Sequence, residues 1–190
     1  MKLWHGGRNL ESDYTEPKKA TKGRWEYGPG LYLTTHYETA YKYAKGGGKT
    51  YMVHFELGTS INDVTIKIEE ALDFIQENVT KSKRSIILED IHFHMKRMNQ
   101  TDNLDANVFL NLMINHDAVI GGKTVNLNRF LVEQGIDYST VDRFSGRDET
   151  VVVIFNNKLI KSVKPIKAKD VSLDDYELPI ENKTSNKIKP

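Results

Sequence analysis

The chain has 190 residues, of which 38% are hydrophobic and 28% are charged, as is ordinary for a soluble globular protein with a real core. Its 27 basic and 26 acidic residues leave a formal charge of +1, which excludes the strongly basic field typical of non-specific nucleic-acid binding. Cysteine is absent, so disulfides, thiolate metal sites and cysteine nucleophiles are excluded. Residues 1–7 lack the apolar run of a signal peptide, and no apolar stretch is long enough to span a membrane. We therefore expect a soluble, cytoplasmic protein without a membrane partner.

The N-terminal segment predicts two short strands joined by a polar loop. Residues 3–5 read as a strand that ends in the glycines at 6–7. Residues 31–33 read as a buried strand, because they follow a Gly-Pro-Gly turn signal at 28–30. The segment between the strands has no apolar period and contains a basic cluster of Lys18, Lys19, Lys22 and Arg24.

A helix and a third strand are predicted next. Thr35 and Glu38 match a capping box, with Thr35 as the N-cap, so a helix is expected from there to the glycines at 46–48. Residues 50–57 alternate between apolar and polar side chains, which is typical of a half-buried strand.

The middle of the chain, residues 66–116, predicts helices. Apolar residues recur at helical spacing in three runs. These runs are Ile68, Ala71, Leu72, Ile75 and Val79; then Leu88, Ile91, Met95 and Met98; then Leu104, Val108, Phe109 and Leu112. A further short helix is predicted over 127–134, with Gly135 as its stop.

Strand character returns at the C-terminal end. Residues 150–155 and 159–166 read as strands separated by an Asn-Asn turn, and residues 171–190 form a polar tail. Strands at both ends of the chain with helices between them predict the α+β class. We expect a single domain over residues 1–170.

Three elements carry side chains suited to chemistry. They are the strand ending in His5, the strand containing Tyr32, and the apolar strand headed by Glu149. Taken singly, each has a simple structural explanation: a hydrogen-bonding histidine, a core tyrosine and a solvated strand entry.

In this order, the three elements resemble the ADP-ribosyltransferases of the His-Tyr-Glu class, the group related to poly-ADP-ribose polymerases. The resemblance rests on His5-Gly6, on Gly28-Pro29-Gly30-Leu31-Tyr32, on Tyr43 in the following helix, and on Glu149 before the valines at 151–153. It covers roughly residues 2–57 and 137–166. It implies a split β-sheet core, with residues 66–116 as a helical insertion.

The resemblance also implies residue roles toward NAD. His5 would bond ribose hydroxyls, and the Gly6 main chain would pair with the nicotinamide amide. Tyr32 and Tyr43 would sandwich the nicotinamide ring, and Glu149 would bond the ribose 2′-hydroxyl. A fixed carboxylate suits this chemistry, because cleavage of the nicotinamide–ribose bond develops oxocarbenium-like positive charge on the sugar. No metal is needed, because nicotinamide is already a competent leaving group.

The sequence departs from the family at two places. The helix position where relatives often carry a small hydroxyl residue is Ala40, and Thr39 is a candidate substitute. Asp148 adjoins Glu149, so either carboxylate is a candidate for catalysis.

Other motifs fail on spacing. Gly46–Thr50 and Gly121–Thr124 resemble phosphate loops, but Tyr43 and Asp117 occupy the required first-glycine positions. His92 and His94 lie two apart on a predicted helix and point to different faces, so with His116 they do not predict a metal site.

The leading interpretation is an NAD-dependent ADP-ribosyltransferase that modifies a macromolecule and releases nicotinamide, as an intracellular toxin or defence effector. The basic cluster at 18–24 favours RNA or DNA over protein as acceptor, and Lys81, Lys83 and Arg84 form a second basic cluster. The alternatives are an NAD glycohydrolase, or a non-catalytic module that binds NAD or ADP-ribose. The helical segment is a candidate binding surface for an antitoxin or another regulatory protein.

Overall fold

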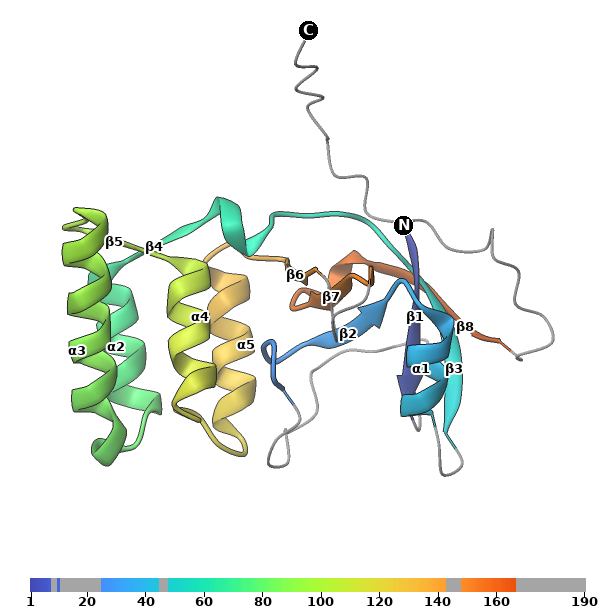
Figure 1. The fold of residues 1–190 in the computed structure, drawn as a ribbon, viewed down its shortest axis with the longest axis horizontal. Coiled ribbons are helices and arrows are strands. Elements are labelled where there is room, and N and C mark those ends of the chain that lie inside the picture. The colour runs from blue at the N-terminus through green and yellow to red at the C-terminus, as the bar shows by residue number, and fades with distance from the viewer. Residues whose placement is uncertain (8–9, 11–24, 45–47, 143–147, 167–190) are drawn as a thin grey trace, which may run out of the picture.

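A computed structural model of the chain describes residues 1–7, 10, 25–44, 48–142 and 148–166 (Figure 1). The predicted basic loop at 18–24 and the predicted tail at 171–190 lie outside these residues. The described helices are α1 (Tyr37–Tyr43), α2 (Ile68–Asn78), α3 (Lys81–Met98), α4 (Ala106–Asn115) and α5 (Lys123–Glu133). The described strands are β1 (Lys2–Gly7), β2 (Leu31–Thr34), β3 (Lys49–Phe55), β4 (Thr65–Lys67), β5 (Asn103–Asp105), β6 (Tyr138–Val141), β7 (Val151–Ile154) and β8 (Ile160–Ile166). Short 3₁₀ turns lie at Ile61–Asp63 and Asn157–Leu159.

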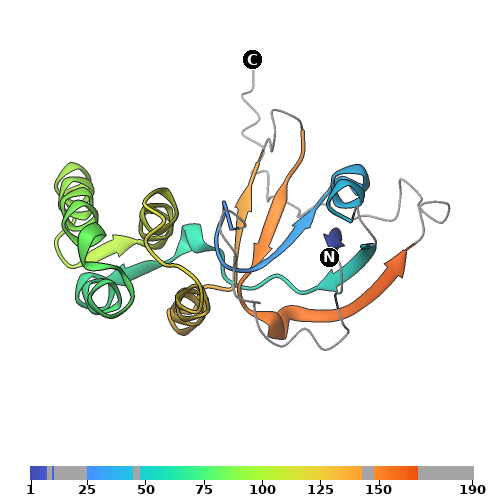
Figure 2. The same cartoon turned by 90° about the horizontal axis from the view of Figure 1, so that it is seen from below.

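A six-stranded sheet in the order β6-β7-β2-β1-β3-β8 forms the right-hand part of Figure 1. Its neighbouring strands pair antiparallel, and β4 and β5 form a separate antiparallel pair among the helices. In Figure 2, β6 and β7 run in a different direction from β8, so the sheet is strongly twisted from one edge to the other. The fold is α+β, as the sequence predicted.

The pairing between β1 and β2 is much shorter than the pairing on either side of it. Trp4 opposite Thr34 is its register pair among the described residues, whereas β1 pairs with β3 along its whole length and β2 pairs with β7 along its whole length. The sheet therefore consists of two well-paired halves, β6-β7-β2 and β1-β3-β8, that meet at one short contact.

Apolar residues form a core on each side of the sheet. On one side, alternate residues of the strands pack together, including Leu3, Leu33, Val53 and Ile154. On the other side, Val151, Val153 and Phe155 pack into a larger core with α2, α4 and α5. The four helices α2–α5 thus gather at one side of the sheet, with α4 and α5 next to it and α2 and α3 farther out (Figures 1 and 2).

The predicted strands are present with small shifts at their ends. Residues 3–5 lie in β1, 31–33 in β2, 150–155 overlap β7 and 159–166 overlap β8. The strand predicted over 50–57 ends at Phe55, and Leu57 beyond it is 45% exposed. β6 was not predicted, because its sequence Tyr-Ser-Thr-Val carries a single strongly apolar residue.

Two helix predictions were wrong in detail. The segment 66–116 contains α2, α3 and α4, but α3 buries Ile87 and Ile91, whereas the predicted Leu88 and Met98 are 40% and 56% exposed. Apolar residues lie on all sides of α3, so their spacing in the sequence does not identify which face of the helix is buried. The helix predicted over 127–134 starts earlier, at Lys123, and Gly135 follows it with a positive φ of 78°, as expected for a helix stop.

The capping box at Thr35 was also wrong. The N-cap of α1 is His36, and no side chain caps the helix. The Thr35 hydroxyl instead accepts a hydrogen bond from the main-chain N–H of Thr150, at 3.2 Å. Thr35 therefore attaches the end of β2 to the segment that enters β7.

In the described part of the chain, none of the helices combines the length and the apolar character needed to cross a bilayer.

Candidate functional site

The junction of β1 and β2 carries His5. Its Nδ1 lies 2.9 Å from the main-chain oxygen of Tyr32. Because a carbonyl oxygen only accepts, Nδ1 carries the proton, and Nε2 of the neutral ring is an acceptor. Burial lowers the pKa of His5 below its ordinary value of 6.5, and the hydrogen bond to Tyr32 opposes this in part. The arrangement thus favours a neutral imidazole of one tautomer.

The two glycines after His5 allow close packing. A Cβ on Gly6 would lie 1.7 Å from the main-chain oxygen of Ala40 in α1, and a Cβ on Gly7 would lie 2.6 Å from Nε2 of His5. The missing side chain of Gly6 therefore lets α1 pack directly on β1. The sequence assigned this glycine to a ligand contact, whereas the structure also requires it for the packing of the helix.

The Tyr32 hydroxyl is fixed by two main-chain contacts. Its hydroxyl donates to the main-chain oxygen of Gly28 at 2.8 Å and accepts from the main-chain N–H of Tyr27 at 3.0 Å. Burial raises the pKa of Tyr32, and the hydrogen bond from the Tyr27 main chain opposes this in part. Tyr43, the last residue of α1, is 67% exposed.

The side chains of His5 and Tyr32 leave the sheet on different sides. His5 lies near Tyr51, with ring centroids 6.2 Å apart, on the side of the core that contains Leu3 and Leu33. Tyr32 packs against the core that contains Val153. The structure joins the two residues through the Tyr32 main chain, at the place where the halves of the sheet meet.

Glu149 is a buried carboxylate, only 2% exposed. Its Oε1 accepts a hydrogen bond from the Thr34 hydroxyl at 2.5 Å, and its Oε2 accepts one from the Thr39 hydroxyl at 3.1 Å. Asp148 beside it is exposed. Of the two candidate carboxylates, Glu149 is thus the one that lies against β2 and α1.

Sequence reasoning missed Thr34. Its position in β2, alternating with the buried Leu33, gives a weak signal, since a threonine there reads equally well as an ordinary strand residue. Thr39, the suggested substitute for a hydroxyl at Ala40, contacts Glu149, while Ala40 faces Gly6. The hydroxyl on this helix therefore bonds the carboxylate.

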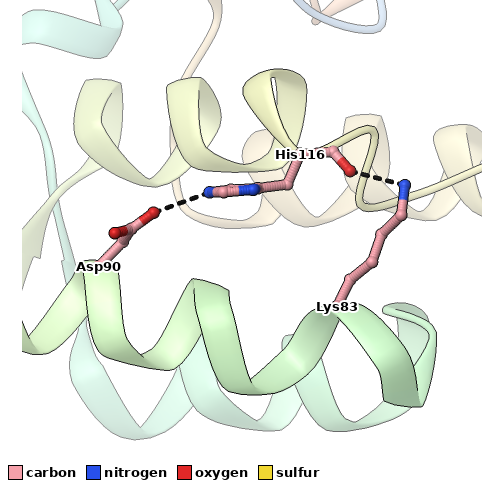
Figure 3. A network of polar contacts seen from close by, with 3 residues as sticks. All are labelled: Lys83, Asp90 and His116. Atoms are coloured by element: carbon pink, nitrogen blue, oxygen red, sulfur yellow. Dashed lines mark hydrogen bonds and ion pairs between the residues drawn. The ribbon is translucent and has the colours of Figure 1, made fainter.

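The second basic cluster is largely used in packing (Figure 3). Lys83 donates to the main-chain oxygens of His116 and Asp117 at 2.6 and 2.7 Å, and Arg84 donates to the main-chain oxygen of Val79 at 2.9 Å. His116 in turn pairs with Asp90 at 2.7 Å. These contacts cap helix ends and join α3 to the end of α4, so Lys83 and Arg84 do not form an open cationic patch.

Among the described residues, no group of three or more His, Asp or Glu side chains is arranged to hold a metal ion.

No protein-family model and no curated protein matches the chain. Among solved structures, the crystal structure of an anti-CRISPR protein is similar to it, with 16% identity and a TM-score of 0.41 over 87% of this chain and 95% of that chain. A likeness of this degree carries no argument about fold family or function.

Proposed function

We propose that the chain is an NAD-dependent ADP-ribosyltransferase of the His-Tyr-Glu class, with a split-sheet core. The observation that carries the proposal is the meeting of three distant segments around the short β1–β2 contact. His5 bonds Tyr32, Gly6 lies under α1, and Glu149 is held by Thr34 and Thr39. If the motifs resembled the family only by chance, there would be no reason for these three segments to lie next to one another.

The nicotinamide end of NAD would lie between Tyr32 and Tyr43. Tyr43 is 67% exposed, so its ring is open to a ligand. An aromatic contact of this kind contributes about 0.5–1.5 kcal/mol beyond the burial of apolar area. The Gly6 main chain would pair with the carboxamide of the same ring.

The ribose would lie toward Glu149, whose partner Thr34 is two residues from Tyr32 in β2 and so faces the same side of the sheet. The His5 side chain leaves the sheet on the other side, so its proposed role is to hold the Tyr32 main chain through the Nδ1 bond. The Glu149 carboxylate would stabilise the positive charge that develops at the ribose C1′. The C1′–N bond breaks with its electron pair on nicotinamide, the acceptor atom bonds C1′, and Glu149 receives the acceptor's proton before solvent does.

The proposed acceptor is a macromolecule, and RNA or DNA is the first class to test. This preference rests on the lysines and arginine at 18–24, which lie between the His5 and Tyr32 motifs in the sequence. An enzyme of this kind, acting inside a cell, would serve as a toxin or a defence effector, with an antitoxin or another regulatory protein as a further partner.

The test is incubation of the protein with labelled NAD and separate pools of RNA, DNA and protein. Wild type should release nicotinamide and label one pool. Glu149→Gln, which keeps the shape of the side chain and removes its charge, should lower the rate about 10²–10³-fold. Asp148→Asn is the matched control, because it removes the adjacent exposed carboxylate.

Each other outcome has a distinct meaning. Nicotinamide release with no labelled pool would make the protein an NAD glycohydrolase, in which water is the acceptor. NAD binding without turnover would make it a binding module. Wild-type activity in Glu149→Gln together with loss of activity in Asp148→Asn would move the catalytic role to Asp148.

A further inference from the structure

We propose that Thr34 and Thr39 are positioning residues that hold the Glu149 carboxylate for the proposed reaction from two separate elements, β2 and α1. This inference rests on the proposed function, because it assigns a role in the chemistry of the same carboxylate. Neither threonine is assigned a contact with NAD.

The contacts form a buried polar cluster. Each carboxylate oxygen of Glu149 accepts one threonine hydroxyl. Thr34 is 6% exposed and Thr39 is 8% exposed, so the donors are buried together with the acceptor. A buried carboxylate without such donors is strongly destabilising, so both contacts restrict where the Glu149 side chain lies.

The Thr34 hydroxyl has a set orientation. It accepts a hydrogen bond from the main-chain N–H of His36 at 3.0 Å, so its own proton is free to point at Glu149. His36 is also the N-cap of α1, so the start of the helix sets the direction of this hydroxyl. Rotation of the hydroxyl away from the carboxylate would give up its bond to Glu149.

Thr39 links the carboxylate to the proposed nicotinamide contact. Residues four apart on a helix lie on the same face, so Thr39 and Tyr43 both point from one side of α1. Gly6 lets the main chain of α1 pack directly on β1, which fixes the height of the helix above the strand. One short helix thus places both the carboxylate partner and the tyrosine that would stack on the leaving group.

Glu149 can still serve a substrate in this arrangement. An ionised carboxylate has about four acceptor positions, and the two threonines use two of them. A ribose hydroxyl therefore adds a bond to a carboxylate that is already oriented. Preorganisation of this kind acts on the transition state, so its loss should appear in kcat more than in KM for NAD.

The experiment compares Thr34→Val and Thr39→Val, which keep the branched shape and remove the hydroxyl, with Thr34→Ser and Thr39→Ser, which retain it. Each valine variant should lower kcat roughly 10- to 100-fold, the effect expected for a hydrogen bond to a charged group, with KM for NAD changed less than threefold or so. The serine variants should recover most of kcat. Thr124→Val is the matched control, since it removes a buried threonine hydroxyl in α5 that donates to the Gly121 main chain.

A second measurement is the rate of the double variant Thr39→Val with Glu149→Gln. If Thr39 acts through Glu149, the double variant should lose no more activity than Glu149→Gln alone, because the two changes disturb one interaction. Melting temperature, measured for every variant, identifies any loss of activity that is only loss of folded protein. If Thr39→Val does not fold, the serine variant and the Thr34 pair decide the question.

The outcomes separate this inference from the proposed function. An active wild type, an inactive Glu149→Gln and fully active valine variants would overturn the inference and leave the function standing. Additive losses in the double variant would also overturn it. Absence of NAD turnover in wild type would end the proposed function and the inference together.

Discussion

The layer of helices α2–α5 and the cluster of Thr34, Thr39 and Glu149 bury different kinds of residue. The helical layer packs mostly apolar side chains, among them Phe74, Phe109 and Met113, against one another. The cluster buries hydroxyls and a carboxylate, each of which has a specific partner. Apolar burial is non-directional and tolerates changes of shape, whereas a buried polar group depends on one or two atoms. Substitutions in the helical layer should therefore change stability, and substitutions near Glu149 should change chemistry.

Phe109→Ala is expected to have the largest effect on stability. Phe109 is fully buried and contacts the rings of Phe74 and Phe130, with centroids 5.7 and 5.3 Å away. The cavity left by the ring should lower the free energy of unfolding by about 3–5 kcal/mol, measured by urea titration. Phe93→Ala, at a ring that is 61% exposed, is the matched control and should change it by less than about 0.5 kcal/mol. If the folded Phe109→Ala variant has a lower kcat than wild type, the helical layer affects chemistry as well as stability, and the proposed difference between the two regions is wrong.

Gly6→Ala tests the close approach of α1 to β1. Because a Cβ would overlap the Ala40 main-chain oxygen, the helix must shift, and the free energy of unfolding should fall by about 1–3 kcal/mol. Tyr43 and Thr39 would move with the helix, so the folded protein should also lose NAD turnover. Lys49→Ala, at an exposed position of the neighbouring strand β3, should leave both quantities near wild type. Equal stability of Gly6→Ala and wild type would contradict the packing described above.

His5 should make stability depend on pH. Since burial lowers its pKa below 6.5, the folded protein keeps the ring neutral at pH values where the unfolded chain is already protonated. The stability associated with a neutral His5 is present above pH 6.5 and is lost as the pH falls from there toward the lowered pKa. Urea titrations across this range should show a smaller decline for His5→Gln than for wild type. His54→Gln, at an exposed histidine of β3, controls for the removal of one imidazole; an unchanged decline in His5→Gln would contradict the assignment.

Asp90→Asn should have the smallest effect. The Asp90–His116 pair between α3 and the end of α4 is partly exposed, with side-chain exposures of 42% and 22% (Figure 3). Pairs of this kind contribute at most about 1 kcal/mol, and less at high salt. The variant should therefore unfold within about 1 kcal/mol of wild type at 0.1 M salt, with no change in NAD turnover. A larger loss of unfolding free energy would mean that this polar contact stabilises the packing of the helices as much as their apolar core does.

Local sequence patterns were sufficient to predict most strands and the α+β class. The alternation in residues 50–57 and the apolar run at 151–155 depend on neighbouring side chains, so they are visible without the fold. The same patterns did not distinguish Ile87 from Leu88 in α3, and they gave no sign of β6. Both depend on tertiary packing. An apolar residue on a helix is buried only where another element covers that face, and the polar segment of β6 forms a strand because it pairs with β7.

The order of His5, Tyr32 and Glu149 along the chain was enough to suggest a class of chemistry, because residue types and spacing are properties of the sequence. Only the tertiary structure placed Glu149 rather than Asp148 inside the protein and identified Thr34 and Thr39 as its hydrogen-bond donors. These donors lie 115 and 110 residues from Glu149 in sequence. A hydrogen bond needs two atoms within about 3 Å, and across such separations only the pairing of β2 with β7 and the packing of α1 bring them together.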